Sequence, residues 1–507
     1  MSDPVLWVLV CLQIFMGGFD VFYHHEFTER LTWKPAAATE LMLHSARNGL
    51  YAVLFFTFAW FEPHGIWAGL IAAILVIEIL ITLWDFVEED LSRKLPASER
   101  VTHTLLAINY GAILAYIVPI LISWTALATE FRPVFYGLGS VLLTASAAGV
   151  LLFAVRDSVI SRRVQALAQA LVSAETLADA LDHRYRVVVT GGTGFIGARL
   201  VEALSAAGHA VIVLTRDPAK AAELRPPFTT VTNLNQIPKH LRIDAVVNLA
   251  GEPIGNGLWT RRKRCRALRS RLKTTQAVGR FMRRLETPPK VLIAASAIGF
   301  YGLRSEEVLS EADGGTDCFS HRLTAAVERA AKDAGRGIAR TVCLRIGLVL
   351  GREGGILATL LPAFDWCVGG PIGSGRQWMS WIERDDLVRL IIHAIITEDL
   401  DGAVNATAPN PVRNAEFAST LGHSLGRPAI LRLPAWLIRL GLGDMGHELL
   451  LSGQRVMPIK VLASGFDFRY AQLDAALDYC LGRTQNARNA PEVPLANNSR
   501  LEERARS

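Results

Sequence analysis

The first 155 residues contain five long apolar stretches, and these constrain the fold more than any other feature of the chain. They lie near Pro4–Phe22, His44–Phe61, Gly65–Trp84, Leu105–Ala128 and Val134–Val155. A helix needs about 20 apolar residues to cross a bilayer, and each stretch approaches that length. The first stretch lacks a basic start and a small-residue cleavage site, so it is typical of a span and not of a signal peptide. We therefore predict a helical membrane domain over residues 1–156, with about five transmembrane helices.

The positions of the basic residues predict how these spans are oriented. Between spans one and two, between spans three and four and after span five lie Arg30, Lys34, Arg47, Arg93, Lys94, Arg100, Arg156, Arg162 and Arg163. The opposite side has only Arg132. Because basic loops stay in the cytoplasm, we expect a multi-pass protein of the inner (plasma) membrane with its N-terminus outside and its C-terminal part cytoplasmic. The net charge of +6 then reflects topology and a basic tail, so the expected partner is the lipid bilayer and not nucleic acid.

The six cysteines indicate a reducing compartment. They stand at positions 11, 265, 318, 343, 367 and 480, and none belongs to a Cys-x-x-Cys pair. Scattered single cysteines are typical of proteins without structural disulfides. The pattern also offers no thiolate metal site.

The membrane half carries polar residues that an anchor does not need. Asp20 and His24, and likewise Glu40 and His44, are spaced by four residues, so each pair presents two ligand-type groups on one helix face. Glu78 lies within the third span, where an ionisable side chain is costly and indicates a functional site.

Two interpretations of this polar group remain open. Histidines and carboxylates that converge from several helices can build a metal site or a proton relay. The candidate metal ligands are His24, Glu40, His44, Asp85 and His103. Alternatively, these residues cap helices and form ion pairs at the interface, with Glu78 protonated or paired with Arg47.

Beyond the spans, residues 157–184 predict a helical linker, and an α/β domain follows over residues 185–482. Strand-like runs at Arg186–Thr190, Ala210–Thr215, Ala245–Leu249, Val291–Ala295 and Thr341–Ile346 alternate with helical stretches. This alternation is typical of a doubly wound, Rossmann-type parallel sheet covered by helices on both faces. Residues 483–507 lack apolar periodicity and are predicted to be disordered.

A glycine turn between a strand and a helix predicts that this domain binds a dinucleotide. The segment Thr190-Gly-Gly-Thr-Gly-Phe-Ile-Gly197 follows the first strand-like run. Gly191 allows the tight turn, Gly194 lets backbone N–H groups approach a pyrophosphate, and Gly197 lets the helix pack on the strand. The helix N-terminus then favours the anion. The expected contacts are made by Gly191, Thr193, Gly194, Phe195, Ile196 and Gly197.

The end of the second strand favours NADP(H) over NAD(H). NAD-selective proteins commonly place an acid there to bind the ribose 2′-hydroxyl. This chain has Thr215 and then Arg216, a cation that suits a 2′-phosphate. Asp217 follows one step later, beside Pro218, where we expect it to cap a helix.

Seven ordered segments carry a family resemblance over about residues 186–482. They are the glycine turn, Asn248-Leu-Ala-Gly-Glu-Pro-Ile254, Ser296-Ala-Ile-Gly-Phe-Tyr-Gly302, Ser380-Trp-Ile-Glu-Arg-Asp-Asp-Leu387, Asn405-Ala-Thr-Ala-Pro-Asn-Pro411, Ser452-Gly-Gln-Arg-Val-Met-Pro458 and Ala463-Ser-Gly-Phe-Asp-Phe468. Together they resemble the atypical epimerase-like branch of the extended short-chain dehydrogenase/reductase superfamily, also labelled nucleoside-diphosphate-sugar epimerase or SulA-like. The resemblance implies a small C-terminal module on the substrate side of the sheet. It also implies that Leu249, Ala250 and Gly251 flank the cofactor.

The same resemblance implies a catalytic serine but not the usual catalytic pair. Ser296 stands at the position that polarises a substrate carbonyl or hydroxyl, although a strand-end serine can also simply bond backbone. The superfamily's Tyr-x-x-x-Lys should fall near residues 318–328, where this chain has neither residue type. Tyr301 and His321 are the candidates to assist Ser296. Further candidates, for which packing or ion pairing is the alternative, are Arg322, Arg345, Glu383 and Arg384.

Three functions are compatible with these features. The first is a membrane-anchored NADP(H)-binding protein of epimerase or reductase type, acting on a small molecule that partitions into the membrane. The second is a non-catalytic NADP(H)-binding sensor or scaffold, favoured by the missing pair. The third is a membrane redox enzyme whose His/carboxylate metal site is supplied with electrons by the cytoplasmic domain.

Overall fold

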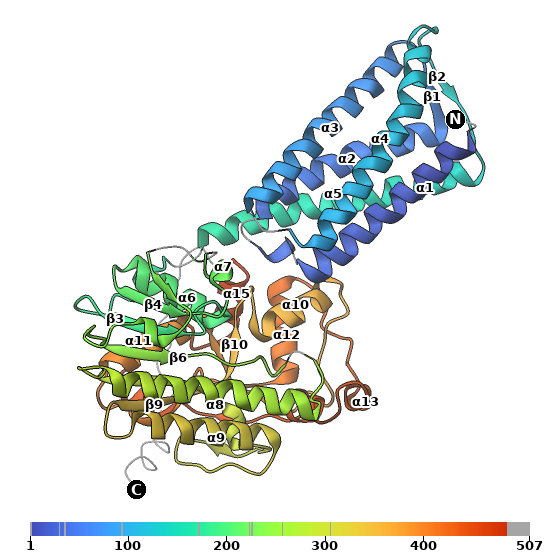
Figure 1. The fold of residues 1–507 in the computed structure, drawn as a ribbon. Coiled ribbons are helices and arrows are strands. Elements are labelled where there is room, and N and C mark those ends of the chain that lie inside the picture. The colour runs from blue at the N-terminus through green and yellow to red at the C-terminus, as the bar shows by residue number, and fades with distance from the viewer. Residues whose placement is uncertain are drawn as a thin grey trace. The chain divides into compact units, whose positions relative to one another are not determined.

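The computed structural model divides the chain into two compact units, Met1–Leu171 and Val172–Ser507 (Figure 1). We call them the helical unit and the α/β unit. The structure describes residues 3–483 except for 30, 35–36, 93–94, 171–172, 223, 225–226, 256 and 305. The predicted disordered tail from residue 484 therefore lies outside the described residues. So do Arg30, Arg93 and Lys94, which contribute to the predicted topology.

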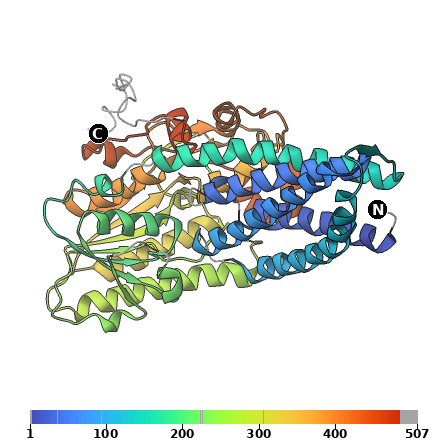
Figure 2. The same ribbon diagram turned by 90° about the horizontal axis from the view of Figure 1, so that it is seen from above.

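Five α-helices make up most of the helical unit. They are α1 (Pro4–Phe19), α2 (Ala38–Trp60), α3 (Ile66–Ser92), α4 (Ala97–Thr125) and α5 (Leu138–Ala170). A π-helical segment, η1 (Asp20–Thr28), and a short 3-10 turn, η2 (Leu31–Trp33), follow α1. The α-helices run side by side in both views (Figures 1 and 2). Their apolar side chains form a common core that includes Leu6, Phe58 and Leu121.

Among the described residues, four helices are long and apolar enough to cross a membrane, whereas the sequence predicted five spans. The four candidates run over Pro4–Trp33, Ile66–Leu91, Ala97–Thr125 and Leu138–Gln165. The remaining predicted span, His44–Phe61, lies in α2, which has 23 residues. The first half of α2 carries Glu40, His44 and Arg47, and these polar side chains lower its hydropathy below that of a clear span.

Two short strands bring the α2–α3 connection and the α4–α5 connection together at one end of the helical unit. β1 (Phe61–Pro63) follows α2, β2 (Phe131–Pro133) follows α4, and the two pair antiparallel. Many apolar side chains point outward from the helices, including Phe15 at 73% exposure and Leu138 at 87%. A soluble protein rarely exposes so many large apolar groups in one region.

The α/β unit is built on a seven-stranded parallel sheet with the order β13-β9-β7-β6-β3-β4-β5. The strands are β3 (Arg186–Thr190), β4 (Ala210–Leu214), β5 (Thr229–Val231), β6 (Ala245–Asn248), β7 (Val291–Ala297), β9 (Arg340–Ile346) and β13 (Gly402–Ala406). All neighbouring strands pair parallel. The predicted Rossmann-type sheet is therefore confirmed, and β5 and β13 extend it beyond the five predicted strands.

Successive side chains of each strand point to opposite faces of the sheet, and both faces are buried. Val187 and Val189 of β3 belong to one apolar core, which also contains residues of α6 (Phe195–Ala206) and α11 (Arg384–Ile396). Val188 belongs to the other core, together with residues of α8 (Arg261–Arg284). This explains why the strands read as continuous apolar runs.

Shorter elements complete the α/β unit. The helices are α7 (Pro218–Ala221), α9 (Phe319–Gly335), α10 (Gly355–Asp365), α12 (Asn414–Leu425), α13 (Ala435–Gly446), α14 (Ile459–Ala463) and α15 (Leu473–Cys480). The strands are β8 (Val308–Leu309), β10 (Leu348–Leu350), β11 (Trp378–Met379), β12 (Trp381–Glu383), β14 (Val412–Arg413) and β15 (Arg455–Val456), which form two-stranded pairs. 3-10 and π turns lie at Glu175–Leu177, Leu234–Gln236, Ile298–Tyr301 and His447–Leu451.

The segment predicted as a separate linker is divided between the two units. Its first residues continue α5, which ends at Ala170. Further on, Leu177, Ala178 and Leu181 are buried in the apolar core of the α/β unit beside α6. Leu177 and Leu181, which the sequence assigned to a polar linker helix, therefore pack against the Rossmann-type core.

A buried ion pair fixes α6 within the α/β unit. Both oxygens of the Asp385 carboxylate accept hydrogen bonds from Arg199 of α6, at 2.8 and 2.9 Å, and Tyr479 donates a third bond at 2.8 Å. Burial alone would raise the pKa of Asp385, but the Arg199 guanidinium holds it below its ordinary value. The pair joins α6, α11 and α15, and so it holds the start of α6 against the sheet.

Candidate functional site

The glycine turn between β3 and α6 has the geometry of an anion cradle. Gly191 has a φ of +73°, and a Cβ atom there would lie 2.8 Å from the carbonyl carbon of Leu249. A Cβ atom at Gly197 would overlap the carbonyl oxygen of Gly191. Both positions therefore require glycine, one for the turn and one for the close approach of α6 to the strand.

The N-terminus of α6 has no side-chain cap. Gly194 occupies the N-cap position with extended backbone, and a Cβ atom there would meet within 4 Å only the carbonyl oxygen of Gly191, at 3.2 Å. The backbone N–H groups of Phe195 and Ile196, in the first turn of α6, have no partner within the helix. Such a terminus binds phosphate through its N–H groups and its dipole.

The end of β6, the strand paired with β3, forms the second side of this cradle. Thr190 Oγ1 donates to Asn248 Oδ1 at 2.6 Å and accepts from the N–H of Ala250 at 3.3 Å. The N–H of Leu249 donates to the carbonyl oxygen of Thr190 at 3.1 Å. The structure thus brings Leu249 and Ala250 against the glycine turn. Gly251 follows them, and a Cβ atom there would lie 2.8 Å from the guanidinium carbon of Arg271.

The residues after β4 fit the predicted preference for a 2′-phosphate. Asp217 caps α7, accepting from the N–H groups of Ala219 and Lys220, so its predicted capping role is confirmed. Arg216 is exposed two residues after the end of β4. The carboxylate is therefore engaged by the helix, while the cation is available to a ligand. Together with the uncapped α6 N-terminus, these residues fit a phosphorylated dinucleotide.

A second polar cluster lies at the carboxyl ends of β7, β9 and β13. Ser296 of β7 is paired in register with Arg345 of β9, which is paired in register with Asn405 of β13. Ser296 Oγ donates to Glu328 Oε1 at 2.8 Å. Arg345 holds both oxygens of that carboxylate, at 2.9 and 3.1 Å. A parallel sheet binds its ligands at this edge, so the cluster is in the right place for chemistry.

Tyr301 is part of this cluster but is fully buried. Its hydroxyl oxygen accepts from Arg345 at 3.0 Å, and its single proton has two acceptors within reach, Asn405 Oδ1 at 2.7 Å and the carbonyl oxygen of Ser310 at 2.9 Å. Burial raises its pKa to about 12, although Arg345 acts in the opposite direction. This environment gives Tyr301 a positioning role toward Arg345.

His321 lies near the start of α9 and is partly buried. Its Nδ1 contacts the carbonyl oxygen of Phe300.

Glu328 is the partner of Ser296 that sequence reasoning did not identify. It lies on α9, 32 residues beyond the serine, and it is 4% exposed. The sequence offered one signal for this cluster. Ser296 and Arg345 stand at the ends of two strand-like runs, and the ends of parallel strands lie at one edge of a sheet.

Glu383 has a structural role at the start of α11. It caps the helix by accepting from the N–H groups of Asp385 and Asp386, and burial raises its pKa well above the ordinary value. The alternative considered for Glu383 was packing or ion pairing, whereas the structure gives it the role of a helix cap.

The helical unit contains a third polar cluster. The structure brings three of the five predicted metal ligands, Glu40, His44 and His103, into groups whose donor atoms lie within 4.8 Å of one another. His25 and Glu89, absent from the predicted set, complete one group. Asp85 contacts His44, whose Nε2 lies 3.0 Å from Asp85 Oδ2.

His24 belongs to neither of these groups. Its Nε2 lies 3.4 Å from the hydroxyl of Thr102. The prediction assumed a regular α-helix of 3.6 residues per turn, which would place His24 above Asp20. The π-helical turns of η1 instead bring His25 to that face.

Comparison with known proteins gives a consistent family. Residues 187–406 match the model of the NAD-dependent epimerase/dehydratase family, and residues 433–480 match a domain of unknown function, DUF1731. The epimerase family protein SDR39U1 of Bos taurus is 39% identical over 297 residues, covering 58% of this chain and 98% of the relative. The epimerase family protein YfhF of Bacillus subtilis is 35% identical over 295 residues, covering 57% and 96%.

A solved structure shows the same relationship. The crystal structure of human SDR39U1 (isoform 2) with NADPH is similar with a TM-score of 0.54 and 35% identity. The match covers 59% of this chain and 100% of the human chain. The predicted resemblance to an epimerase-like branch of the extended short-chain dehydrogenases is thus confirmed, and the chain belongs to the epimerase family that includes the SDR39U1 proteins.

Proposed function

We propose that this protein is a membrane-anchored, NADP(H)-binding member of the epimerase family that exchanges hydride with a small-molecule substrate. The observation that carries the proposal is the uncapped α6 N-terminus at the glycine turn, with exposed Arg216 after the next strand. The human relative, 35% identical, was crystallised with NADPH, which supports the same choice of cofactor. Gly191, Thr193 to Gly197 and Leu249 to Gly251 would hold the pyrophosphate side, and Arg216 the 2′-phosphate.

The cluster around Ser296 supplies a proton path in place of Tyr-x-x-x-Lys. When bound, the nicotinamide supplies or accepts the hydride. A substrate hydroxyl that donates to Ser296 Oγ can lose its proton there as the serine proton moves to Glu328 Oε1. In the opposite direction the same path returns the proton to a carbonyl oxygen. Arg345 stabilises the Glu328 carboxylate and fixes its orientation.

A non-catalytic sensor or scaffold is the second candidate, and a specific observation favours it. Tyr301 is buried and fully hydrogen-bonded, so it does not reach a ligand as the superfamily's tyrosine does. His321 contacts the backbone of Phe300. In this case NADP(H) would bind without turnover. The redox-enzyme alternative requires a metal centre in the helical unit.

We place the helical unit in the inner (plasma) membrane, with the N-terminus outside and the α/β unit in the cytoplasm. The four apolar helices and their outward-facing apolar side chains support membrane insertion, and α2, with 23 residues, provides the fifth crossing that this orientation requires. The β1–β2 pairing supports the topology, because it brings the two connections assigned to the outside together. A substrate that partitions into the membrane would then be accessible, and nucleic acid is not an expected partner.

The choice of cofactor is tested by Arg216→Ala. Losing one charge-assisted contact costs about 1.5–3 kcal/mol, so the Kd of NADPH should rise about 10- to 100-fold while that of NADH changes little. Isothermal titration of the full-length protein in detergent measures both constants. Lys220→Ala removes a nearby exposed charge and serves as the matched control. Equal affinity for NADH and NADPH in the unaltered protein would refute the preference.

The proton path is tested by Ser296→Ala. We expect NADPH-dependent reduction of carbonyl compounds to fall at least about 100-fold in kcat, because general acid–base catalysis contributes that much, while the Kd of NADPH stays unchanged. Ser464→Ala, which alters another partly buried serine, is the control. Unchanged turnover in Ser296→Ala would remove the serine from the mechanism. NADPH binding without turnover of any carbonyl compound would favour the sensor.

The topology is tested by labelling cysteines in intact cells with a membrane-impermeant maleimide. Cys265 is exposed on the α/β unit and should react only after lysis. Ala128→Cys places a thiol on the exposed segment between α4 and β2, which we assign to the outside, so it should react in intact cells. The reverse pattern would show that the orientation is inverted.

A further inference from the structure

Four helical segments of the helical unit each contribute two ionisable side chains spaced by one turn. The pairs are Asp20 and His25 on η1, Glu40 and His44 on α2, Asp85 and Glu89 on α3, and Glu99 and His103 on α4. Seven of these eight side chains are buried to 6% exposure or less, and His103 is 13% exposed. Converging pairs of this kind are how helix bundles build metal centres.

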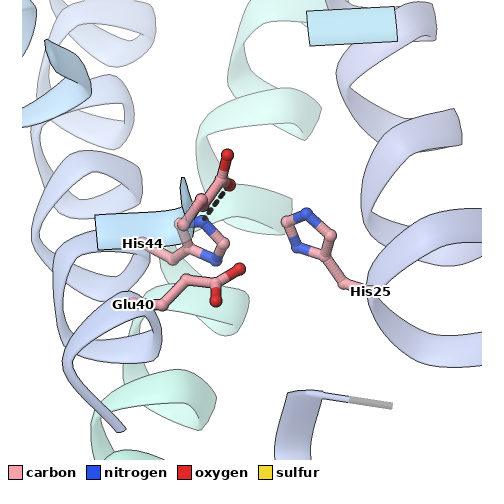
Figure 3. A group of neighbouring side chains, drawn as sticks. His25, Glu40 and His44 are labelled. Carbon is pink, nitrogen blue, oxygen red and sulfur yellow. Dashed lines mark ion pairs between the residues drawn. The ribbon is translucent and has the colours of Figure 1, made fainter. Parts of the chain in front are cut away.

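The π-helical geometry of η1 is part of this arrangement. A π-helix bonds each residue to the fifth one along, so Asp20 and His25 share a face that they would not share in an α-helix. Such segments are rare, and they occur frequently at functional sites. Here the π-turns bring a third histidine to the group. Figure 3 shows His25 facing Glu40 and His44 from a different helix.

The distances between donor atoms fit the size of a metal ion. The ligand atoms of His25, Glu40, His44 and Glu89 all lie within 4.8 Å of one another, as do those of Asp20, His25 and His103. The rings of His25 and His44 are stacked, with their centroids 4.7 Å apart, and since an imidazole binds a metal in the plane of its ring, one ring would turn to share an ion with the other. Ligand atoms bound to one ion at about 2.0–2.2 Å lie at most about 4.4 Å apart, so an ion would draw the most distant of these atoms slightly closer together.

Two carboxylate oxygens at the cluster accept no hydrogen bond from the described residues. Oδ1 of Asp20 and Oδ1 of Asp85 are buried, and neither accepts a hydrogen bond there. A buried carboxylate oxygen normally has a partner, since its desolvation is otherwise uncompensated. Asp20 belongs to one of the two groups and Asp85 contacts His44 of the other, so these oxygens leave acceptor capacity beside the site for a cation.

The cluster borders a cavity of about 530 Å³ inside the helical unit. Most of the lining is apolar, and the charged groups in it are Asp20, Arg47 and His103. Two of these are members of the cluster, and Arg47 donates to Asp85 at 3.0 Å. Structural metal sites are closed, whereas catalytic ones keep a coordination position open to a ligand. Asp20 and His103 bring the edge of the cluster to this cavity, whereas His25, Glu40, His44 and Glu89 do not line it.

We propose that the helical unit binds a divalent first-row transition metal ion through His25, Glu40, His44 and Glu89, with Asp20 and His103 beside it. Imidazole and carboxylate donors without thiolates suit Fe²⁺, Mn²⁺ or Zn²⁺. Cys11, the cysteine of the helical unit, is exposed and outside the cluster. The proposal does not depend on NADP(H) binding, so either can fail alone.

The experiment measures metal in the full-length protein, purified in detergent without chelators. Plasma mass spectrometry should find about one Fe, Mn or Zn ion per chain. After removal by a chelator, Co²⁺ should restore the same stoichiometry and give visible d–d absorption bands. This second readout uses the unaltered protein, so it does not depend on whether a variant folds.

Variants then locate the ion. Glu40→Gln and His44→Gln should lower metal affinity at least about tenfold. Glu78→Gln is the matched control, because Glu78 is equally buried in the same unit but belongs to neither group of close donor atoms, and its Oε1 accepts from Tyr51 and Thr82. His64→Gln, at a buried histidine outside the cluster, is the second control. Circular dichroism and gel filtration check that each variant is folded.

Two results would overturn the proposal. One is less than about a tenth of an ion per chain, both as purified and after incubation with Fe²⁺, Mn²⁺, Zn²⁺ and Co²⁺. The other is equal metal retention by folded Glu40→Gln and Glu78→Gln, which would place any bound ion elsewhere.

Discussion

The close approach of backbone to backbone at the glycine turn is the constraint on which the α/β unit depends. Gly197 lies against the carbonyl oxygen of Gly191, so a side chain at Gly197 would separate α6 from the strand end, and a side chain at Gly191 would meet the backbone of Leu249 and Ala250. Because α6 starts directly at this turn, its N-terminal N–H groups are left free of a side-chain cap. The Arg199–Asp385 pair then holds α6 in place from its other side. One packing requirement thus creates the phosphate-binding end of the proposed cofactor site.

The same sheet edge carries the proposed chemistry. Ser296, Arg345 and Asn405 occupy matching positions on three adjacent strands, and Tyr301 connects Arg345 to Asn405. Glu328 enters from α9 and connects the serine to the guanidinium. A hydroxyl backed by a fixed carboxylate can exchange a proton, which is the task that Tyr-x-x-x-Lys performs elsewhere in the superfamily. The absence of that pair therefore does not by itself exclude catalysis.

Local patterns predicted most of the fold, and their limits have physical causes. β3 was predicted with the bounds that the structure shows, because an apolar run before glycines has few other solutions. β5 and β13 were missed: β5 has only three residues, and Asn405 interrupts the apolar pattern of β13.

The number of candidate spans differed from the predicted five because α2 is apolar only in its second half. His24 was chosen over His25 because a sequence does not reveal π-helical turns. Glu328 was missed because its contact with Ser296 depends on tertiary packing.

The central claim is that NADP(H) binds at the glycine turn, and hydrogen–deuterium exchange tests it most directly. Exchange of the full-length protein in detergent should be compared with and without NADPH. The account predicts slower exchange at Gly191–Gly197 and Leu249–Gly251, where backbone groups would meet the cofactor, and unchanged exchange in the helical unit. Saturating NADPH without protection at the glycine turn, or with protection confined to another region, would contradict the account.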